Sequence, residues 1–206
     1  MKSILLTALA ENQLSLPPDT VNKLVTYLEL IQKWNRVFNL TSITEPKEMV
    51  YLHIIDSLLT APFITGQRCL DVGSGAGLPG IPLAILNPEQ EWVLMDKNNK
   101  KTRFMTQAIA ELKLTKVQAV HTRAEDFHPD VCFDHVVARA YASLTLFIKT
   151  TRHLICKNGT FVALKGKYPQ EELAETAGLI QASNVTPVIM QGMTLDRHIV
   201  VFYPIT

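Results

Sequence analysis

Three glycines at alternate positions, Gly73, Gly75 and Gly77, follow a short apolar run that contains Asp71 near its end. Alternate glycines let a backbone turn tightly and approach a ligand that a side chain would push away. Pro79 is typical of the first turn of a helix, whose free N–H groups would face the same ligand. The segment therefore predicts a strand, a ligand-binding loop and a helix, with the ligand at the carboxyl end of the strand.

Two classes of ligand compete for this loop. Gly75, Gly77 and Gly80 match the spacing of the dinucleotide fingerprint, although a lone match of this kind is a weak signal. In a dinucleotide-binding protein, the strand before the fingerprint would be apolar up to its first glycine. Here Asp71 and Gly73 lie between the apolar residues and Gly75. If the loop instead begins at Gly73, Asp71 lies at the strand tip, where it can engage the α-ammonium group of S-adenosylmethionine. The pyrophosphate of NAD has no such group, so S-adenosylmethionine is favoured.

Two further strand ends carry acids that suit an adenosine. Asp96 ends the second candidate strand, close to the roughly 20-residue offset of a carboxylate that binds ribose hydroxyls. Ala124 and Glu125 follow the third strand, where backbone groups and a carboxylate would lie beside an adenine amino group. The structural alternative is that the glycines only make a tight turn. The acids at successive strand ends favour a ligand-binding site over this alternative.

The elements that must position these residues fall into two sections. Up to about residue 63, apolar residues recur at helical spacing, and from Gln67 short apolar runs alternate with helix-length segments. The second pattern is typical of βαβ winding around a parallel sheet. Seven candidate strands span residues 68–73, 91–96, 116–121, 133–138, 159–165, 185–190 and 198–203. Too few residues separate the last two for a crossover helix, so these two should pair antiparallel.

We therefore expect an α/β fold with a Rossmann-like, seven-stranded, mostly parallel sheet and an antiparallel last strand. The predicted domains are an N-terminal helical extension over residues 1–63 and an S-adenosylmethionine-dependent methyltransferase domain over residues 64–206.

Composition sets bounds on compartment and partners. The chain has 206 residues, of which 47% are hydrophobic, and a net charge of +1. Its overall field is weak, so a nucleic acid would have to be held by a local basic patch. The apolar start is shorter than the roughly 15–30 residues of a signal peptide. No apolar run approaches the roughly 18 residues of a membrane span. We expect a cytoplasmic protein with no membrane partner.

The cysteines predict neither a disulfide framework nor a metal site. Cys69, Cys132 and Cys156 include no closely spaced pair, and a zinc site would need such spacing. A reducing compartment is the simpler expectation.

Six segments together resemble the ribosomal RNA small subunit methyltransferase G family, also called glucose-inhibited division protein B. They are WNRVFNLTSI (34–43), HIIDSL (53–58), LDVGSGAGLPGIPLAI (70–85), ARAYASL (138–144), ALKG (163–166) and DRHIVV (196–201). The glycine loop alone would indicate only a methyltransferase, whereas the first two segments and the LPGIPLAI continuation are much more specific. One departure is Ala76, where many members carry Pro, and it touches no position to which we assign chemistry.

The resemblance implies a class I methyltransferase that transfers a methyl group from S-adenosylmethionine to N7 of a guanine in 16S rRNA. The guanine is at position 527 in the usual rRNA numbering, in the small ribosomal subunit, and we expect the enzyme to act as a monomer. N7 carries an in-plane lone pair and loses no proton, so the reaction needs alignment rather than a base or a covalent nucleophile. Two alternatives stay open: an NAD-dependent oxidoreductase and a non-catalytic RNA-binding or assembly factor.

Arg139 is the predicted catalytic residue, because it ends the fourth strand at the mouth of the site. Its guanidinium can fork onto a phosphate or the O6 edge of a guanine, or hold the methionine carboxylate. The structural alternative for Arg139 is a salt bridge to Glu125 or Asp126. The resemblance favours a functional role, because the Arg of this segment is among the cofactor contacts of the family. The full set of expected cofactor-binding residues is Asp71, Gly73, Gly75, Gly77, Leu78, Asp96, Ala124, Glu125 and Arg139.

The expected RNA-binding residues are Arg36, Lys165 and Arg197, which with nearby lysines would make a local basic surface. Asn39 and His53 belong to the two specific N-terminal segments. They can either line the RNA side of the site or cap helices, and the sequence favours neither.

Overall fold

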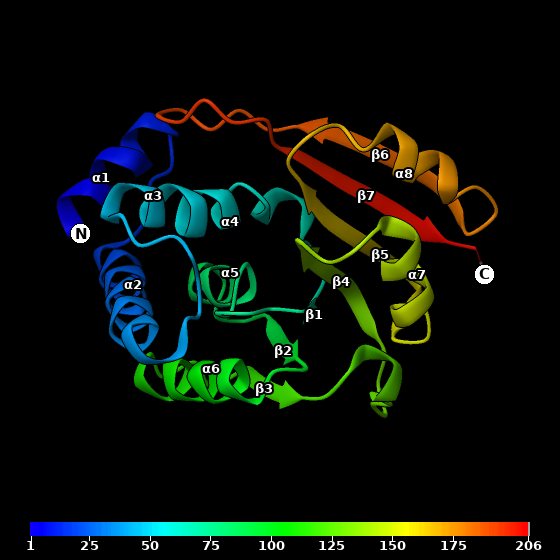
Figure 1. The fold of residues 1–206 in the computed structure, drawn as a ribbon, viewed down its shortest axis with the longest axis horizontal. Helices are drawn as coiled ribbons and strands as arrows, with labels where there is room; N and C mark the ends of the chain where they lie inside the picture. The colour runs from blue at the N-terminus through cyan, green and yellow to red at the C-terminus, as the bar shows by residue number, and fades with distance from the viewer. Residues whose placement is uncertain (206) are drawn as a thin grey trace.

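The computed structural model describes residues 1–205, built around a seven-stranded sheet in the order β3-β2-β1-β4-β5-β7-β6 (Figure 1). The strands are β1 (Arg68–Val72), β2 (Glu91–Asp96), β3 (Val117–His121), β4 (Phe133–Arg139), β5 (Ile155–Lys165), β6 (Ile180–Pro187) and β7 (His198–Pro204). The first five strands pair parallel, and β7 runs antiparallel between β5 and β6. The predicted fold class is confirmed.

The prediction for β6 was wrong by several residues, because the strand begins at Ile180 rather than at residue 185. β6 is an edge strand, and Gln181, Ser183 and Asn184 along it are exposed. An edge strand needs few apolar side chains, so its first half lacks the apolar run by which strands were recognised. The apolar residues Val188 and Ile189 lie after the strand, in the connection to β7.

Helices cover both faces of the sheet (Figure 1). One face carries α1 (Lys2–Glu11), α2 (Pro18–Phe38), α3 (Pro46–Met49), α4 (Asp56–Leu58), α5 (Gly80–Leu86) and α6 (Asn99–Glu111). The other carries α7 (Leu144–Thr151) and α8 (Gln170–Glu175). No helix of residues 1–205 has the length and apolar character needed to cross a bilayer.

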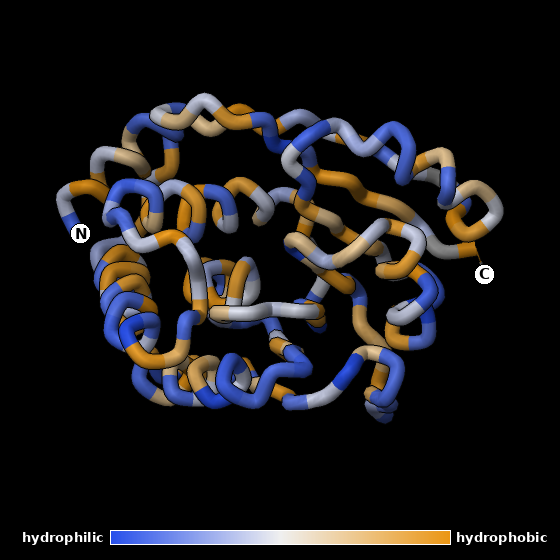
Figure 2. Tube along the Cα trace, viewed as in Figure 1, coloured by the Kyte–Doolittle hydropathy of each residue, from blue (hydrophilic) through white to orange (hydrophobic). Residues whose placement is uncertain are grey.

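The strands divide their side chains between these two layers by simple alternation. In β1, Cys69 packs with the first layer, whereas Leu70 and Val72 pack with the second, which includes Phe147 of α7. Figure 2 shows the hydrophobic residues gathered along the strands and around α5, with hydrophilic residues on the outer turns of α6 and α8.

The N-terminal helices share the core of the α/β section. Leu5 of α1 and Leu28 of α2 belong to the same buried cluster as Ile81 of α5 and Phe104 of α6. The division into residues 1–63 and 64–206 stays a prediction, since both sections bury their apolar side chains against one another.

The connection between β6 and β7 reaches across the molecule to the end of α1 (Figure 1). Asn12 and Gln191 exchange two hydrogen bonds, with N–O distances of 3.1 Å and 2.9 Å, across 179 residues of sequence. A Cβ on Gly192 would lie 2.5 Å from the Glu11 carboxylate and 2.6 Å from the Tyr51 ring. The backbone at this glycine therefore packs directly against the N-terminal helices.

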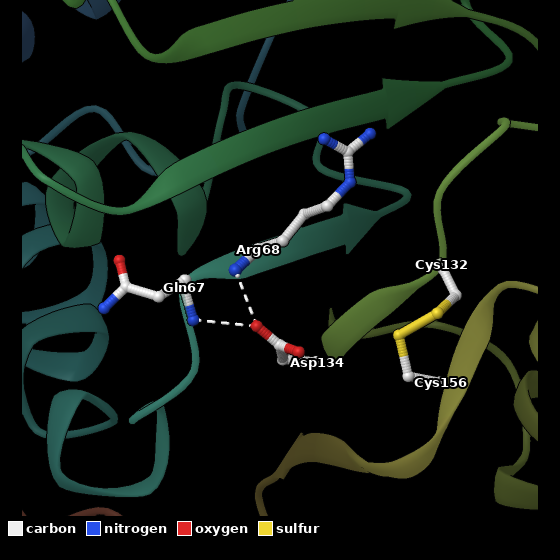
Figure 3. Close-up of a disulfide and its surroundings, with 5 residues drawn as sticks. All are labelled: Gln67, Arg68, Cys132, Asp134 and Cys156. Carbon is white, nitrogen blue, oxygen red and sulfur yellow. Dashed lines mark hydrogen bonds between the residues drawn. A yellow bond between two sulfur atoms is a disulfide. The ribbon is translucent and has the colours of Figure 1, made fainter.

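Cys132 and Cys156 form a disulfide at the amino ends of β4 and β5, which corrects the expectation that the cysteines are unpaired (Figure 3). The parallel pairing of Phe133 with Ile155 brings their neighbours together, so that the two Cα atoms lie 5.0 Å apart. The 24-residue separation gave no sign of this, because the contact depends on strand register. Cys69 is free and buried.

Asp134 fastens the amino end of β1 close to the disulfide (Figure 3). Its carboxylate accepts hydrogen bonds from the backbone N–H groups of Gln67 and Arg68 at 2.8 Å and 2.9 Å. The glycine loop follows the other end of β1, so these contacts hold the sheet from the end opposite to the candidate site.

Candidate active site

The strand order places a crevice at the carboxyl ends of β1 and β4, the usual ligand position in an open α/β sheet. Two cavities lie there. The first, which we call the glycine-loop cavity, has a volume of about 440 Å³ and is lined by the ends of β1 to β4. Among its lining residues are Gly73, Asp96, Ala124, Glu125 and Tyr141. Four of the predicted cofactor-binding residues are thus brought together.

Gly73 and Asp96 shape this cavity. Gly73 has a φ of +69°, and a Cβ there would lie 3.2 Å from the Tyr141 ring. The Asp96 carboxylate accepts hydrogen bonds from the N–H groups of Gly75 at 3.0 Å and Asn98 at 2.8 Å. Each carboxylate oxygen can accept a second bond, so Asp96 ties the loop to β2 and retains acceptor sites for hydroxyl groups.

Asp71 lies beneath the glycine loop and is completely buried. One oxygen accepts hydrogen bonds from the Ser74 hydroxyl at 2.6 Å and the Gly80 N–H at 2.9 Å, while the other has no partner among the described residues. Burial raises the pKa of Asp71 to about 6, against the opposing effect of those two hydrogen bonds. The structure gives this carboxylate a part in folding the loop, and its contact with an ammonium group stays a prediction.

Gly77 and Leu78 face the protein core instead of the glycine-loop cavity. A Cβ on Gly77 would lie 2.4 Å from the Ile81 side chain, so this glycine allows the loop to pack on α5. Leu78 is buried in the first layer. Their predicted cofactor contacts are untested, and the visible reason for these residue types is packing.

Tyr27 of α2 contacts the same loop on the side of the loop that faces the core. Its hydroxyl donates a hydrogen bond of 2.5 Å to the carbonyl of Ala76, and its ring is fully buried. Burial raises the pKa of Tyr27 well above its ordinary value, so the hydroxyl keeps its proton. Tyr27 was not among the predicted site residues. Its three-residue spacing from Leu24 signals the core face of the helix, but nothing in the sequence reveals the partner of its hydroxyl.

The second cavity, which we call the arginine cavity, has a volume of about 390 Å³ and adjoins the first at Ala140, which lines both. Its polar lining includes Thr41, Leu52 through its carbonyl, His53, Asp56, Arg139, Lys165 and Arg197. Arg139 donates through Nη1 to the Leu52 carbonyl at 2.7 Å and lies 3.5 Å from Asp56. The predicted alternative for Arg139, a salt bridge to Glu125 or Asp126, is wrong, because its carboxylate partner is Asp56.

Arg197 shares that carboxylate. Its Nε donates to Asp56 Oδ1 at 2.8 Å, so one buried acid joins two arginines that are 58 residues apart in the sequence. Lys165 also lines the cavity, and its ammonium pairs with Glu172 at 2.7 Å. Arg36 is exposed in the last turn of α2 and is not part of this lining. The structure therefore gathers two of the three predicted RNA-binding residues.

A π-helical stretch, Val50–Ile55, joins α3 to α4 and forms one side of the arginine cavity. The N–H of Asp56 donates to the carbonyl of Tyr51, five residues back, whereas a regular α-helix would use Leu52. His53, within the stretch, is almost completely buried, and burial together with the charge of Arg139 lowers its pKa to about 4. Its imidazole is therefore neutral near pH 7.

The structure separates the two residues that the sequence left undecided. His53 lines the arginine cavity, whereas Asn39 ends α2 in a left-handed conformation with a φ of 49°. Lys97 and Lys101, which follow β2 in the sequence, also line the glycine-loop cavity. Over residues 1–205, no three His, Cys, Asp or Glu side chains are arranged to hold a metal ion.

The sequence is similar to those of proteins that share one name. A family model described as rRNA small subunit methyltransferase G matches residues 20–200. A protein named ribosomal RNA small subunit methyltransferase G from Methylobacillus flagellatus is 43% identical over 200 residues, which cover 97% of each chain. The protein of that name from Laribacter hongkongensis is 44% identical over 200 residues, again covering 97% of each chain.

Solved structures support the same fold at low sequence identity. A putative O-methyltransferase from Klebsiella pneumoniae superposes with a TM-score of 0.61 at 8% identity, covering 87% of this chain and 90% of that one. M. jannaschii TYW2, solved in complex with AdoMet, gives a TM-score of 0.55 at 20% identity, covering 74% of this chain and 76% of that one. The fold is that of the Rossmann-like class I methyltransferases.

Proposed function

Because the chain belongs to the rRNA small subunit methyltransferase G family, we propose that it transfers a methyl group from S-adenosylmethionine to N7 of a guanine in 16S rRNA. The observation that carries this proposal is the junction of the two cavities at Ala140. A transfer reaction needs its two reactants in adjoining spaces with the reacting atoms roughly 3–3.5 Å apart.

The residues of the glycine-loop cavity fit S-adenosylmethionine. Asp96 retains acceptor sites for the two ribose hydroxyls, and Ala124 and Glu125 lie where an adenine would be recognised. The missing side chain at Gly73 keeps space beside the Tyr141 ring for the methionine portion. When bound, S-adenosylmethionine supplies a methyl group that is already activated on a sulfonium.

The protein's own contribution is alignment, because guanine N7 attacks through a lone pair and loses no proton. The chain offers no activated thiol for covalent catalysis, since burial raises the pKa of Cys69, the free cysteine, to about 12. Correct alignment can lower the barrier by roughly 7–11 kcal/mol. Tyr27 and Asp96 hold the glycine loop on one side of the junction, and Asp56 holds Arg139 on the other.

We further propose that the enzyme acts in the cytoplasm, as a monomer, on the small ribosomal subunit rather than on free RNA. A nearly neutral chain has little general attraction for RNA, which favours an assembled substrate with more points of contact. The most exposed large hydrophobic residues lie on separate segments and do not form the continuous patch of a subunit interface; they are Val37, Val131, Tyr168 and Ile189. Light scattering should give the mass of one chain, 23.1 kDa.

The reaction is tested by single-turnover methylation of small subunits that lack the modification. We expect N7-methylguanosine in 16S rRNA, identified by cleavage with borohydride and then aniline. The rate of methyl transfer should vary little between roughly pH 6.5 and 9, because guanine N7 carries no proton that a general base would have to remove. A product methylated on carbon or on an exocyclic amine would contradict the proposal.

Calorimetric titration and the methylation assay together separate the proposal from its two alternatives. S-adenosylmethionine should bind and NAD should not, whereas an NAD-dependent oxidoreductase would show the reverse. A non-catalytic RNA-binding or assembly factor would bind small subunits without any methyl transfer from S-adenosylmethionine.

A further inference from the structure

The arginine cavity adjoins the glycine-loop cavity without belonging to it. Ala140, with a φ of +53°, turns the chain at the end of β4 and is the residue that lines both spaces. The volume of the arginine cavity, about 390 Å³, falls in the range of roughly 300–1,000 Å³ typical of small-molecule sites. We propose that the arginine cavity receives the acceptor guanine, flipped out of the RNA, and that Asp56 is the positioning residue of this pocket. This inference rests on the proposed methyl transfer to guanine N7.

The donors of Arg139 suit the edge of a guanine that must be methylated. Nη1 is occupied by Leu52 and Asp56, while Nε and Nη2 have no partner among the described residues. The acceptor O6 lies on the same edge as N7, and arginine is its usual ligand in nucleic-acid recognition. A donor held at O6 leaves the lone pair of N7 free. Adenine presents an amino group at this position, so donor would face donor and adenine is rejected.

Asp56 fixes the guanidinium that makes this contact. It is 7% exposed, accepts from Arg197 at 2.8 Å and lies 3.5 Å from Arg139. Bonds between charged groups of this kind are about twice as strong as neutral ones and are directional. Without the carboxylate, two guanidinium groups would face each other across a half-buried cavity, and Arg139 would lose its orientation.

The carboxylate also suits the charge that the reaction creates. Methylation at N7 transfers the positive charge of the sulfonium to the guanine ring, as the new C–N bond forms and the C–S bond breaks. Arg139 and Arg197 oppose that charge, and the Asp56 carboxylate offsets one of them. Lys165 is already paired with Glu172, so it adds little. Asp56 therefore lowers the electrostatic cost of the product as well as holding Arg139.

The π-helical stretch provides the second anchor. Because the N–H of Asp56 donates to Tyr51, it leaves the carbonyl of Leu52 available, and Arg139 donates to that carbonyl at 2.7 Å. π-helical turns are rare and occur frequently at functional sites. The helix irregularity and the carboxylate thus orient the same guanidinium from two directions.

The first experiment compares Asp56→Asn with Glu91→Gln, a matched control. Glu91 pairs with Arg68 at 3.0 Å at the amino ends of the strands, so its substitution makes the same charge change away from both cavities. We expect Asp56→Asn to lower the single-turnover rate on the order of 10²-fold. Its Kd for S-adenosylmethionine should stay within about twofold, since neither Asp56 nor Arg139 lines the glycine-loop cavity. Glu91→Gln should change neither quantity.

A second experiment uses the unaltered protein, so it does not depend on the folding of a variant. Small subunits are reconstituted with 16S rRNA that carries inosine or 2-aminopurine at the target position. Inosine keeps O6 and should be methylated, whereas 2-aminopurine lacks O6 and should lose most of the rate. Efficient methylation of 2-aminopurine would overturn the assignment of O6 to Arg139.

The two proposals fail in different ways. If Asp56→Asn weakens S-adenosylmethionine binding by the same factor as it lowers the rate, the arginine cavity serves the cofactor and our inference is wrong. An Asp56→Asn rate equal to that of the control would also overturn it. If the unaltered protein methylates no guanine in small subunits, the proposed function itself fails.

Discussion

Substitution of Tyr27 by Phe tests whether the helical section positions the glycine loop. The change removes one hydroxyl and keeps the ring, which lies 6.4 Å from Phe104 between centroids. It leaves the carbonyl of Ala76, a residue only 5% exposed, without its donor. An unsatisfied buried carbonyl costs about 1–3 kcal/mol. In a protein of this size each kcal/mol shifts Tm by about 2–4 °C, so we expect a decrease of roughly 2–12 °C.

The same variant should bind S-adenosylmethionine several-fold more weakly, because Ala76 lies between two glycines of the loop and the loop loses a fixed point. Calorimetry gives both quantities, as Tm by heating and as Kd by titration. Tyr203→Phe is the matched control, since Tyr203 is 46% exposed on β7. If Tyr27→Phe left the cofactor Kd unchanged, the hydrogen bond would not position the loop, and our account of α2 would be refuted.

Three further predictions concern the loop, its buried acid and the disulfide. Gly73→Val should abolish S-adenosylmethionine binding in a titration, because its Cβ would meet the Tyr141 ring at 3.2 Å and φ is +69°. Gly178→Ala, at a φ of +81° with no atom near, should bind normally, and equal loss in both would show that backbone strain alone is responsible. Burial raises the pKa of Asp71 from 3.8 to about 6, so ionisation of this group disfavours the folded state. Relative to Asp71→Asn, stability should be highest below about pH 4 and fall by about 3 kcal/mol as pH rises through 6, as measured by urea unfolding, and a rise instead would contradict the shift. Replacing Cys132 and Cys156 by Ser opens a link across 24 residues and should lower the free energy of unfolding by about 3 kcal/mol, while methylation of small subunits stays measurable. A folded but inactive double variant would place a thiol in the chemistry.

The sheet and the glycine loop could be predicted because their signals are local. Short apolar runs mark strands that are buried on both faces, and the alternate glycines after Asp71 mark the turn that follows the first of them. The position of Asp96 at the end of β2 follows from the same reasoning. Four predicted cofactor residues line one cavity for this reason.

The arginine cavity could not be predicted in the same way, because its contacts join distant parts of the chain. Asp56 meets Arg197 across 141 residues, and only the fold brings the first residue of α4 beside the residue that precedes β7. The sequence placed Arg139 at the correct strand end but could not show which acid it would meet. The π-helical stretch likewise depends on how the helix packs, since each of its residues is compatible with an ordinary α-helix.

The contact between Asn12 and Gln191 has a consequence for how the chain folds during synthesis. Ribosomes add about 5–20 residues each second, so the partner of α1 is made roughly 9–36 s after α1 itself. During that interval Asn12, just after α1, lacks the backbone partner with which it exchanges two hydrogen bonds in the finished protein. The contact that ties the end of the first helix to the β6–β7 connection is thus among the last to form, and a chain that stops short of residue 191 never forms it.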